Sequence, residues 1–297
     1  MISTSQTSHL DSIDSFLAME VFAKAQALEA QGRDIIHLEF GEPDFTAPRA
    51  ATESIKKSMK INDAGYTFSQ GLEELRNEIV KKYANDYGVI ILPEQVLVSN
   101  GSSLLLYLAI RILAPPGSQV ILTDPCYACY ENVVRLAGSE PVMVKLRHED
   151  GFQLNVDDLK KRVTPKTRAI LINSPMNPTG VVFSSEVMKA IAELDIPVIS
   201  DEIYADLSFE DPPCSFLSYS PQTVAIHGFS KSYAMTGWRL GYMITPLEWM
   251  SAADRLHQNL MISATEFVQE AGISVLRKSA AYCESMKTEF NRRRLFV

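Results

Sequence analysis

The 297-residue chain has few cysteines, no excess of basic residues and no long apolar segment. Its 28 lysines and arginines are outnumbered by 36 aspartates and glutamates, so the net charge is −8, which argues against a nucleic-acid-binding protein. No stretch of about 18 residues is purely apolar, and the sequence therefore predicts no membrane span. The N-terminus also lacks the basic and apolar segments of a secretory signal.

The four cysteines are typical of a protein from a reducing compartment, and we expect a cytoplasmic location. Cys126 and Cys129 form a C-x-x-C pair, but no second pair or nearby histidine completes a zinc-binding pattern. The five histidines are scattered without the spacing of metal ligands, and we interpret His227 as a packing residue. The sequence therefore predicts no metal site.

Short β-branched segments alternate with segments of helical periodicity along most of the chain. The predicted strands are 96–99, 120–123, 169–173, 198–200 and 223–227. The predicted helices are 16–30, 71–87, 103–113, 127–137 and 185–194, and a helical pattern runs from 248 to 297. Buried strands that alternate with helices predict an α/β fold with a doubly wound, mostly parallel sheet.

The residues after each predicted strand are candidates for ligand binding, because open parallel sheets bind ligands at the carboxyl ends of their strands. Ser102 and Ser103 open a helix after strand 96–99, and the free N–H groups of a helix start bind phosphate. Asn177 lies between two prolines after strand 169–173. An ordinary helix cap and a plain turn are the alternative interpretations.

Two further predicted strands are followed by charged residues. Asp201 and Tyr204 follow strand 198–200, and a carboxylate in apolar surroundings needs a partner. Lys231 follows strand 223–227 among several aromatic residues, and a desolvated lysine is a usable nucleophile toward a carbonyl. Arg239 can bind a phosphate through two hydrogen bonds. The alternatives are a helix cap at Asp201 and a solvated lysine in a surface ion pair.

Together these side chains match one ligand, pyridoxal 5′-phosphate (PLP). Lys231 would meet its aldehyde, and Asp201 would meet its ring nitrogen. Asn177 and Tyr204 would donate to its phenolic oxygen, and Tyr127 would stack on its ring. The residues predicted for its phosphate are Ser102, Ser103 and Arg239.

The chain also resembles the class I/II aminotransferases of PLP fold type I. Five segments carry the resemblance: Phe40-Gly-Glu-Pro-Asp-Phe45, Tyr66-Thr-Phe-Ser-Gln-Gly71, Asn177-Pro-Thr-Gly180, Asp201-Glu-Ile-Tyr204 and the Ser230-Lys to Gly237-Trp-Arg-Leu-Gly241 region. The resemblance implies an N-terminal helical arm with part of a small domain (1–49) and a PLP-binding large domain (50–245). A helical segment (246–297) would lead toward the rest of the small domain, which is incomplete in this sequence.

The resemblance implies a role for each matching residue. Lys231 would hold PLP through a Schiff base and move protons at the substrate α-carbon, and Asp201 would keep the ring nitrogen protonated. Tyr204 would act with them as a catalytic residue. Gly41 and Asn177 would contact the substrate. Tyr66 and the residues already assigned to PLP would bind the cofactor, with Tyr66 reaching the phosphate of a neighbouring subunit, which implies a homodimer.

The implied reaction is transfer of an amino group between an L-amino acid and a 2-oxo acid. A PLP-dependent lyase or synthase of the same fold is an alternative, because the large-domain motifs are shared. A PLP-binding protein with little or no activity is a second alternative. The family's substrate-carboxylate arginine has no match here, since the arginines at 292–294 lie outside its motif. We therefore expect weak PLP binding and slow turnover from this sequence.

Overall fold

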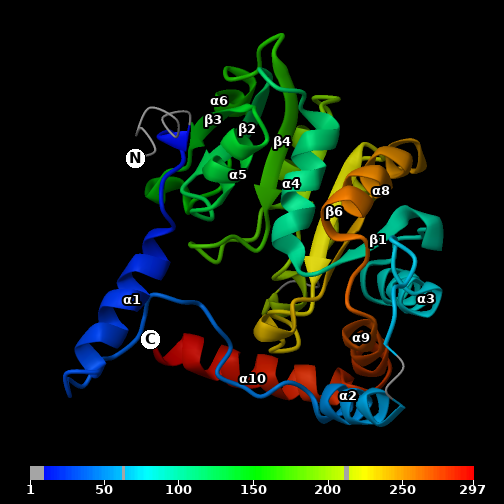
Figure 1. Cartoon of the computed structure of the whole chain (residues 1–297). Coiled ribbons are helices and arrows are strands. Elements are labelled where there is room, and N and C mark those ends of the chain that lie inside the picture. Colours follow the sequence, from blue (N-terminus) through cyan, green and yellow to red (C-terminus); the bar gives the residue numbers. More distant parts are fainter. Residues whose placement is uncertain (1–9, 62–63, 211–213) are drawn as a thin grey trace, which may run out of the picture.

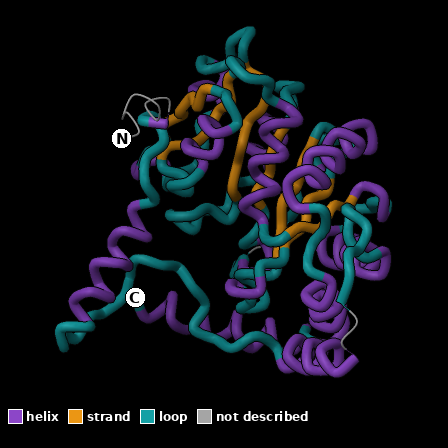
Figure 2. Tube along the Cα trace, viewed as in Figure 1, coloured by secondary structure: helices purple, strands orange, loops and turns teal. Residues whose placement is uncertain are grey.

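A seven-stranded sheet forms the centre of the computed structural model, which describes residues 10–61, 64–210 and 214–297. Helices cover both faces of this sheet (Figures 1 and 2). The strand order is β1-β7-β6-β5-β4-β2-β3. The strands are β1 (Val96–Ser99), β2 (Gln119–Asp124), β3 (Glu140–Lys145), β4 (Thr167–Asn173), β5 (Val198–Asp201), β6 (Thr223–Gly228) and β7 (Gly241–Ile244).

The sheet is mostly parallel, as the sequence predicts. Strands β3, β2, β4, β5 and β6 run parallel, whereas β7 pairs antiparallel with both β1 and β6. All five predicted strands are present, and the prediction missed β3 and β7. Pro141 interrupts the apolar pattern of β3, which tolerates a proline because it is an edge strand that pairs only with β2.

The helices follow the predicted periodicity, with some differences at their ends. They are α1 (Leu17–Glu29), α2 (Arg49–Ile61), α3 (Glu73–Lys82), α4 (Ser102–Leu113), α5 (Tyr130–Leu136), α6 (Val156–Lys160), α7 (Ser185–Ala192), α8 (Leu247–Met261), α9 (Glu266–Lys278) and α10 (Ala280–Phe296). The predicted helix 71–87 is α3 followed by a π-helical turn over Tyr83–Tyr87. Helices α2 and α6 were not predicted.

Alternate residues of each central strand point to opposite faces, and each face has its own apolar core. Ala169 and Leu171 of β4 pack with α4, α5 and α8, whereas Ile170 and Ile172 pack with α6 and α7. A third apolar cluster joins α3 and α9 to β1 and β7. Helices α8 and α9 thus pack on the sheet, while the division of the chain at residues 49 and 245 stays a prediction.

Helix α1 projects away from the sheet, and α10 extends from the end of α9 toward the side on which α1 lies (Figure 1). Three apolar side chains of α1 are largely exposed: Leu17, Met19 and Val21. Across the described ranges, every helix is too short or too polar to cross a lipid bilayer.

Candidate active site

A cavity of about 1380 Å³ brings nine of the ten predicted site residues together. These nine are Gly41, Ser102, Ser103, Tyr127, Asn177, Asp201, Tyr204, Lys231 and Arg239. They come from loops and element ends that are far apart in the sequence, as expected for the carboxyl edge of a parallel sheet. Tyr66 does not line this cavity, and 84% of its surface is exposed.

Asp201 ends strand β5, and its carboxylate is buried beneath the cavity. It accepts hydrogen bonds from the Tyr130 hydroxyl at 2.8 Å and from the Ile203 N–H at 3.1 Å. Burial raises the pKa of Asp201 to about 6, although these two donors act in the opposite direction. No cationic side chain is within salt-bridge distance of Asp201 among the described residues, so a cationic ligand group would find an unpaired partner here.

Asn173, at the end of β4, links the ends of two strands to the Asn177 loop. Its amide donates to the Asp201 carbonyl at 2.8 Å, and its Oδ1 accepts from the Asn177 N–H at 2.7 Å. The Asn177 side-chain amide then donates to the Tyr204 hydroxyl at 3.5 Å. The buried Asn173 side chain, which the sequence analysis did not predict, therefore joins the Asn177 loop to the end of β5.

Lys231 follows strand β6 and lines the same cavity as Asp201, with its side chain half-buried. Its Nζ donates to the Gly41 carbonyl at 2.7 Å and lies 6.0 Å from the centre of the Tyr204 ring. Burial lowers the pKa of Lys231, the Arg239 charge lowers it further, and Glu42 acts in the opposite direction. A lysine with a lowered pKa has a larger neutral fraction, which is the form that attacks a carbonyl.

Arg239 and the start of α4 form a cradle for an anion. Gly101 precedes the helix with φ +91°, and a Cβ placed there would lie 2.5 Å from a guanidinium nitrogen of Arg239. Arg239 itself has φ +54°, an uncommon conformation for a residue with a side chain. Because the guanidinium rests on Gly101 beside the first turn of α4, its charge and the free helix N–H groups meet at one point.

Tyr127 presents an aromatic ring to the cavity. It packs edge-on against Phe16, with ring centres 6.1 Å apart, and against Tyr130 at 5.4 Å. Both contacts are T-shaped, so neither neighbouring ring is stacked on Tyr127, which lines the cavity. Burial raises the pKa of Tyr127, so its phenol stays protonated at neutral pH.

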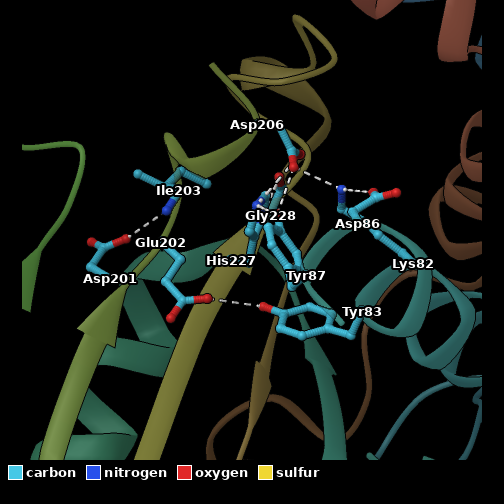
Figure 3. A network of polar contacts seen from close by, with 10 residues as sticks. All are labelled: Lys82, Tyr83, Asp86, Tyr87, Asp201, Glu202, Ile203, Asp206, His227 and Gly228. Atoms are coloured by element: carbon cyan, nitrogen blue, oxygen red, sulfur yellow. Dashed lines mark hydrogen bonds and ion pairs between the residues drawn. The ribbon is translucent and has the colours of Figure 1, made fainter. Parts of the chain in front are cut away.

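A second polar cluster, which we call the charge network, consists of Lys82, Tyr87, Asp206 and His227 (Figure 3). Asp206 accepts from Lys82 at 2.8 Å and from the Tyr87 hydroxyl at 2.6 Å, and the His227 ring lies 3.5 Å from its second oxygen. Burial alone would raise the pKa of Asp206, but the neighbouring charges and donors hold it far below its usual value. Burial lowers the pKa of His227.

Glu202, next to Asp201, points to the other side of β5 and binds only protein groups. It accepts from Ser200 and Ser215 at 2.9 and 3.0 Å, and from the Phe216 N–H at 2.8 Å. Tyr83 donates to its other oxygen at 3.3 Å, as Figure 3 shows. Burial raises the pKa of Glu202 to about 7 despite these donors.

The residues present fit PLP. The buried carboxylate of Asp201 suits a protonated ring nitrogen, and Lys231 offers a partly desolvated amine. The space kept free at Gly101 beside Arg239 suits a phosphate, since a side chain there would displace the guanidinium. Tyr130 and Asn173 support this set. Two features of the sequence could have identified them. Tyr130 comes three residues after Tyr127, and Asn173 is the last residue of the strand that precedes the Asn177 loop.

Comparisons with known proteins identify the family of the chain. The family model described as aminotransferase class I and II matches residues 33–297. The (5-formylfuran-3-yl)methyl phosphate transaminase of Methanocaldococcus jannaschii is 40% identical over 289 residues, covering 96% of this chain and 76% of the relative. An aspartate aminotransferase of Geobacillus stearothermophilus is 36% identical, over 93% of this chain and 72% of its own length.

Solved structures give the same result. The aspartate aminotransferase from Thermus thermophilus with maleate superposes with a TM-score of 0.94 at 32% identity, over 99% of this chain and 78% of that one. These matches confirm the predicted family, fold class and cofactor, and they do not favour the lyase or synthase alternative. The chain belongs to the class I and II aminotransferases and is a PLP-dependent transaminase.

Proposed function

We propose that this chain exchanges amino groups between L-amino acids and 2-oxo acids at the cavity between Asp201 and Lys231. The carrying observation is that an unpaired buried carboxylate and a half-buried lysine with a lowered pKa line the same cavity. PLP supplies an aldehyde that condenses with amines and a ring that withdraws electrons from the α-carbon. The protein supplies the groups that hold the ring and move the proton.

The proposal assigns tasks to the predicted residues around the ring. Lys231 binds the cofactor, then takes a proton from the substrate α-carbon and returns it. Asp201 accepts a hydrogen bond from the ring nitrogen and keeps it protonated. Tyr204 and Asn177 donate to the phenolic oxygen. Tyr127 stacks on the ring.

The remaining predicted residues bind the phosphate and the substrate. Ser102, Ser103 and Arg239 bind the phosphate, supported by the cradle at Gly101. The Gly41 carbonyl, which accepts from Lys231 at 2.7 Å, lies where a substrate would pass the lysine.

We also propose that the working form is a homodimer in the cytoplasm. Tyr66 supports the dimer because its ring is exposed and lies outside the cavity of its own chain. The four cysteines support a reducing compartment because all of them are free thiols.

The test adds PLP to the purified chain and follows its absorbance before and after each of several amino acids. We expect a band of lysine-bound cofactor that converts to the pyridoxamine phosphate form with at least one amino acid, and no such band in Lys231→Ala. The amino-acid panel includes aspartate, because the relatives include aspartate aminotransferases. A band that persists in Lys231→Ala would refute the assignment of the lysine.

A further inference from the structure

Two exposed aromatic rings lie on a segment that is firmly attached to the protein. Residues 65–72, here called the Tyr66 segment, connect the end of α2 with the start of α3 and run beside α9 (Figure 1). Tyr66 and Phe68 are each 84% exposed. An exposed loop that binds no other surface needs few hydrogen bonds to the rest of the protein. This segment, however, is hydrogen-bonded to buried side chains of α8 and α9.

Gln269 of α9 makes two of these hydrogen bonds. Its side chain is fully buried; its Nε2 donates to the Thr67 hydroxyl at 3.0 Å, and its Oε1 accepts from the Leu72 N–H at 2.7 Å. Gly71 lets the segment approach β1 and α9 closely, because a Cβ there would come within 2.7 Å of Val98 and 2.8 Å of Gln269. One buried amide thus fixes both ends of the Tyr66 segment.

His257 of α8 fixes its middle. This histidine is fully buried; its Nδ1 lies 3.0 Å from the Ser69 hydroxyl, and its Nε2 lies 3.1 Å from the Ser99 hydroxyl. Ser99 ends β1, three residues before Ser102 at the phosphate cradle. Burial lowers the pKa of His257, and a neutral ring can donate at one nitrogen and accept at the other.

Buried polar groups are costly unless they are hydrogen-bonded, and here their bonds serve one short surface segment. Tyr66 has no role at the cavity of its own chain, so a rigidly held, exposed Tyr66 is suited to a second surface. Holding it rigid removes the ordering cost that a free loop would add on association. Resting on the proposed dimeric transaminase, we infer that His257 and Gln269 are positioning residues that aim Tyr66 at the phosphate site of a second copy of this chain.

Hybrid dimers with two different affinity tags test this inference, because each site would combine Lys231 of one chain with Tyr66 of the other. In the first hybrid, Lys231→Ala and His257→Leu are on the same chain, and the other chain is wild type. In the second hybrid, the two substitutions are on different chains. Each hybrid has one chain that can bind PLP covalently, and the readout is the PLP concentration that half-fills its absorbance band.

The inference predicts about tenfold weaker PLP binding in the first hybrid, since the intact lysine there receives its Tyr66 from the His257→Leu chain. The second hybrid binds PLP like a hybrid of Lys231→Ala with the wild type. The reverse pattern would overturn the inference, because His257 would then act through Ser99 on its own chain. Equal affinities in both hybrids would overturn it as well.

Two further sets of variants keep the test interpretable. Gln269→Leu should follow the pattern of His257→Leu. Ser69→Ala should follow the same pattern with a smaller change, and it replaces the other two variants if they fail to fold. Gln258→Leu, on the exposed side of α8, is the matched control and should leave both hybrids unchanged. A wild-type chain that binds PLP with equal affinity as a monomer and as a dimer overturns this inference and the proposed dimer but leaves the proposed reaction standing. A wild-type chain that forms no lysine-bound band refutes the proposed reaction as well.

Discussion

The cofactor cavity and the charge network lie on two sides of the same strand ends, yet they treat charge differently. In the charge network, one carboxylate oxygen of Asp206 accepts from Lys82 and Tyr87 of the same chain, and the other lies 3.5 Å from the His227 ring. In the cavity, the donors to Asp201 among residues 10–61, 64–210 and 214–297 are all neutral, and Lys231 donates to a carbonyl. Asp206 lies only five positions after Asp201, but burial raises the pKa of Asp201, whereas at Asp206 burial is outweighed by the neighbouring charges and hydrogen bonds together, which lower its pKa.

This difference shows how one loop can serve both stability and binding. Charges that the chain satisfies itself stabilise the turn after β5, which carries Tyr204. Charges left without a counterion are available to a ligand, at a cost to the stability of the unliganded protein.

Removing the lysine should have the largest effect. Lys231→Ala removes both the covalent anchor of PLP and the proton carrier, and loss of a general base alone lowers rates about 10²–10⁴-fold. We expect transamination to fall by at least this factor, measured as turnover with saturating PLP. Lys81→Ala, an exposed lysine of α3, should retain full activity.

Breaking the charge network should mainly reduce stability. Lys82→Met leaves the buried Asp206 without its ammonium partner, and removing one member of a buried pair costs about 3–5 kcal/mol. Denaturant unfolding of the apoprotein should show this loss. Asp201→Asn is the matched comparison and should not lower the free energy of unfolding. An equal loss in both variants would contradict the contrast between the two regions.

Filling the phosphate cradle should have a smaller effect. Gly101→Ala places a Cβ against the Arg239 guanidinium and strains a backbone at φ +91°. We expect about tenfold weaker PLP binding, in line with the loss of one charge-assisted hydrogen bond. Gly151→Ala, also at positive φ but in open space, controls for backbone strain. Unchanged PLP affinity in Gly101→Ala would argue against a phosphate at this point.

The pH dependence of stability should show the smallest change. Burial raises the pKa of Glu202 to about 7, above its value in the unfolded chain, so the folded protein binds more protons between about pH 4 and 7. The free energy of unfolding therefore falls as pH rises through this range, and Asp201 adds to the fall up to about pH 6. Glu202→Gln should flatten this slope in the apoprotein, whereas Glu78→Gln, paired with Arg277, should not.

The sequence predicted the parallel sheet and nine residues of the cavity because motifs at strand ends are local in the chain. It could not predict the charge network, since Lys82 and Asp206 are 124 residues apart and meet only through tertiary packing. His227 was interpreted as a packing residue, and it is buried and stacked on Tyr242. Tyr130 follows Tyr127 by three residues, which is a signal in the sequence, but its contact with Asp201 across 71 residues depends on tertiary packing.

We propose above all that PLP binds between Lys231, which follows β6, and Asp201, which ends β5. The most direct measurement is a PLP titration of Asp201→Asn, followed by the lysine-bound absorbance band. The account predicts at least about tenfold weaker binding, because a charged hydrogen bond to the ring nitrogen is lost. A wild-type affinity in this variant would contradict it.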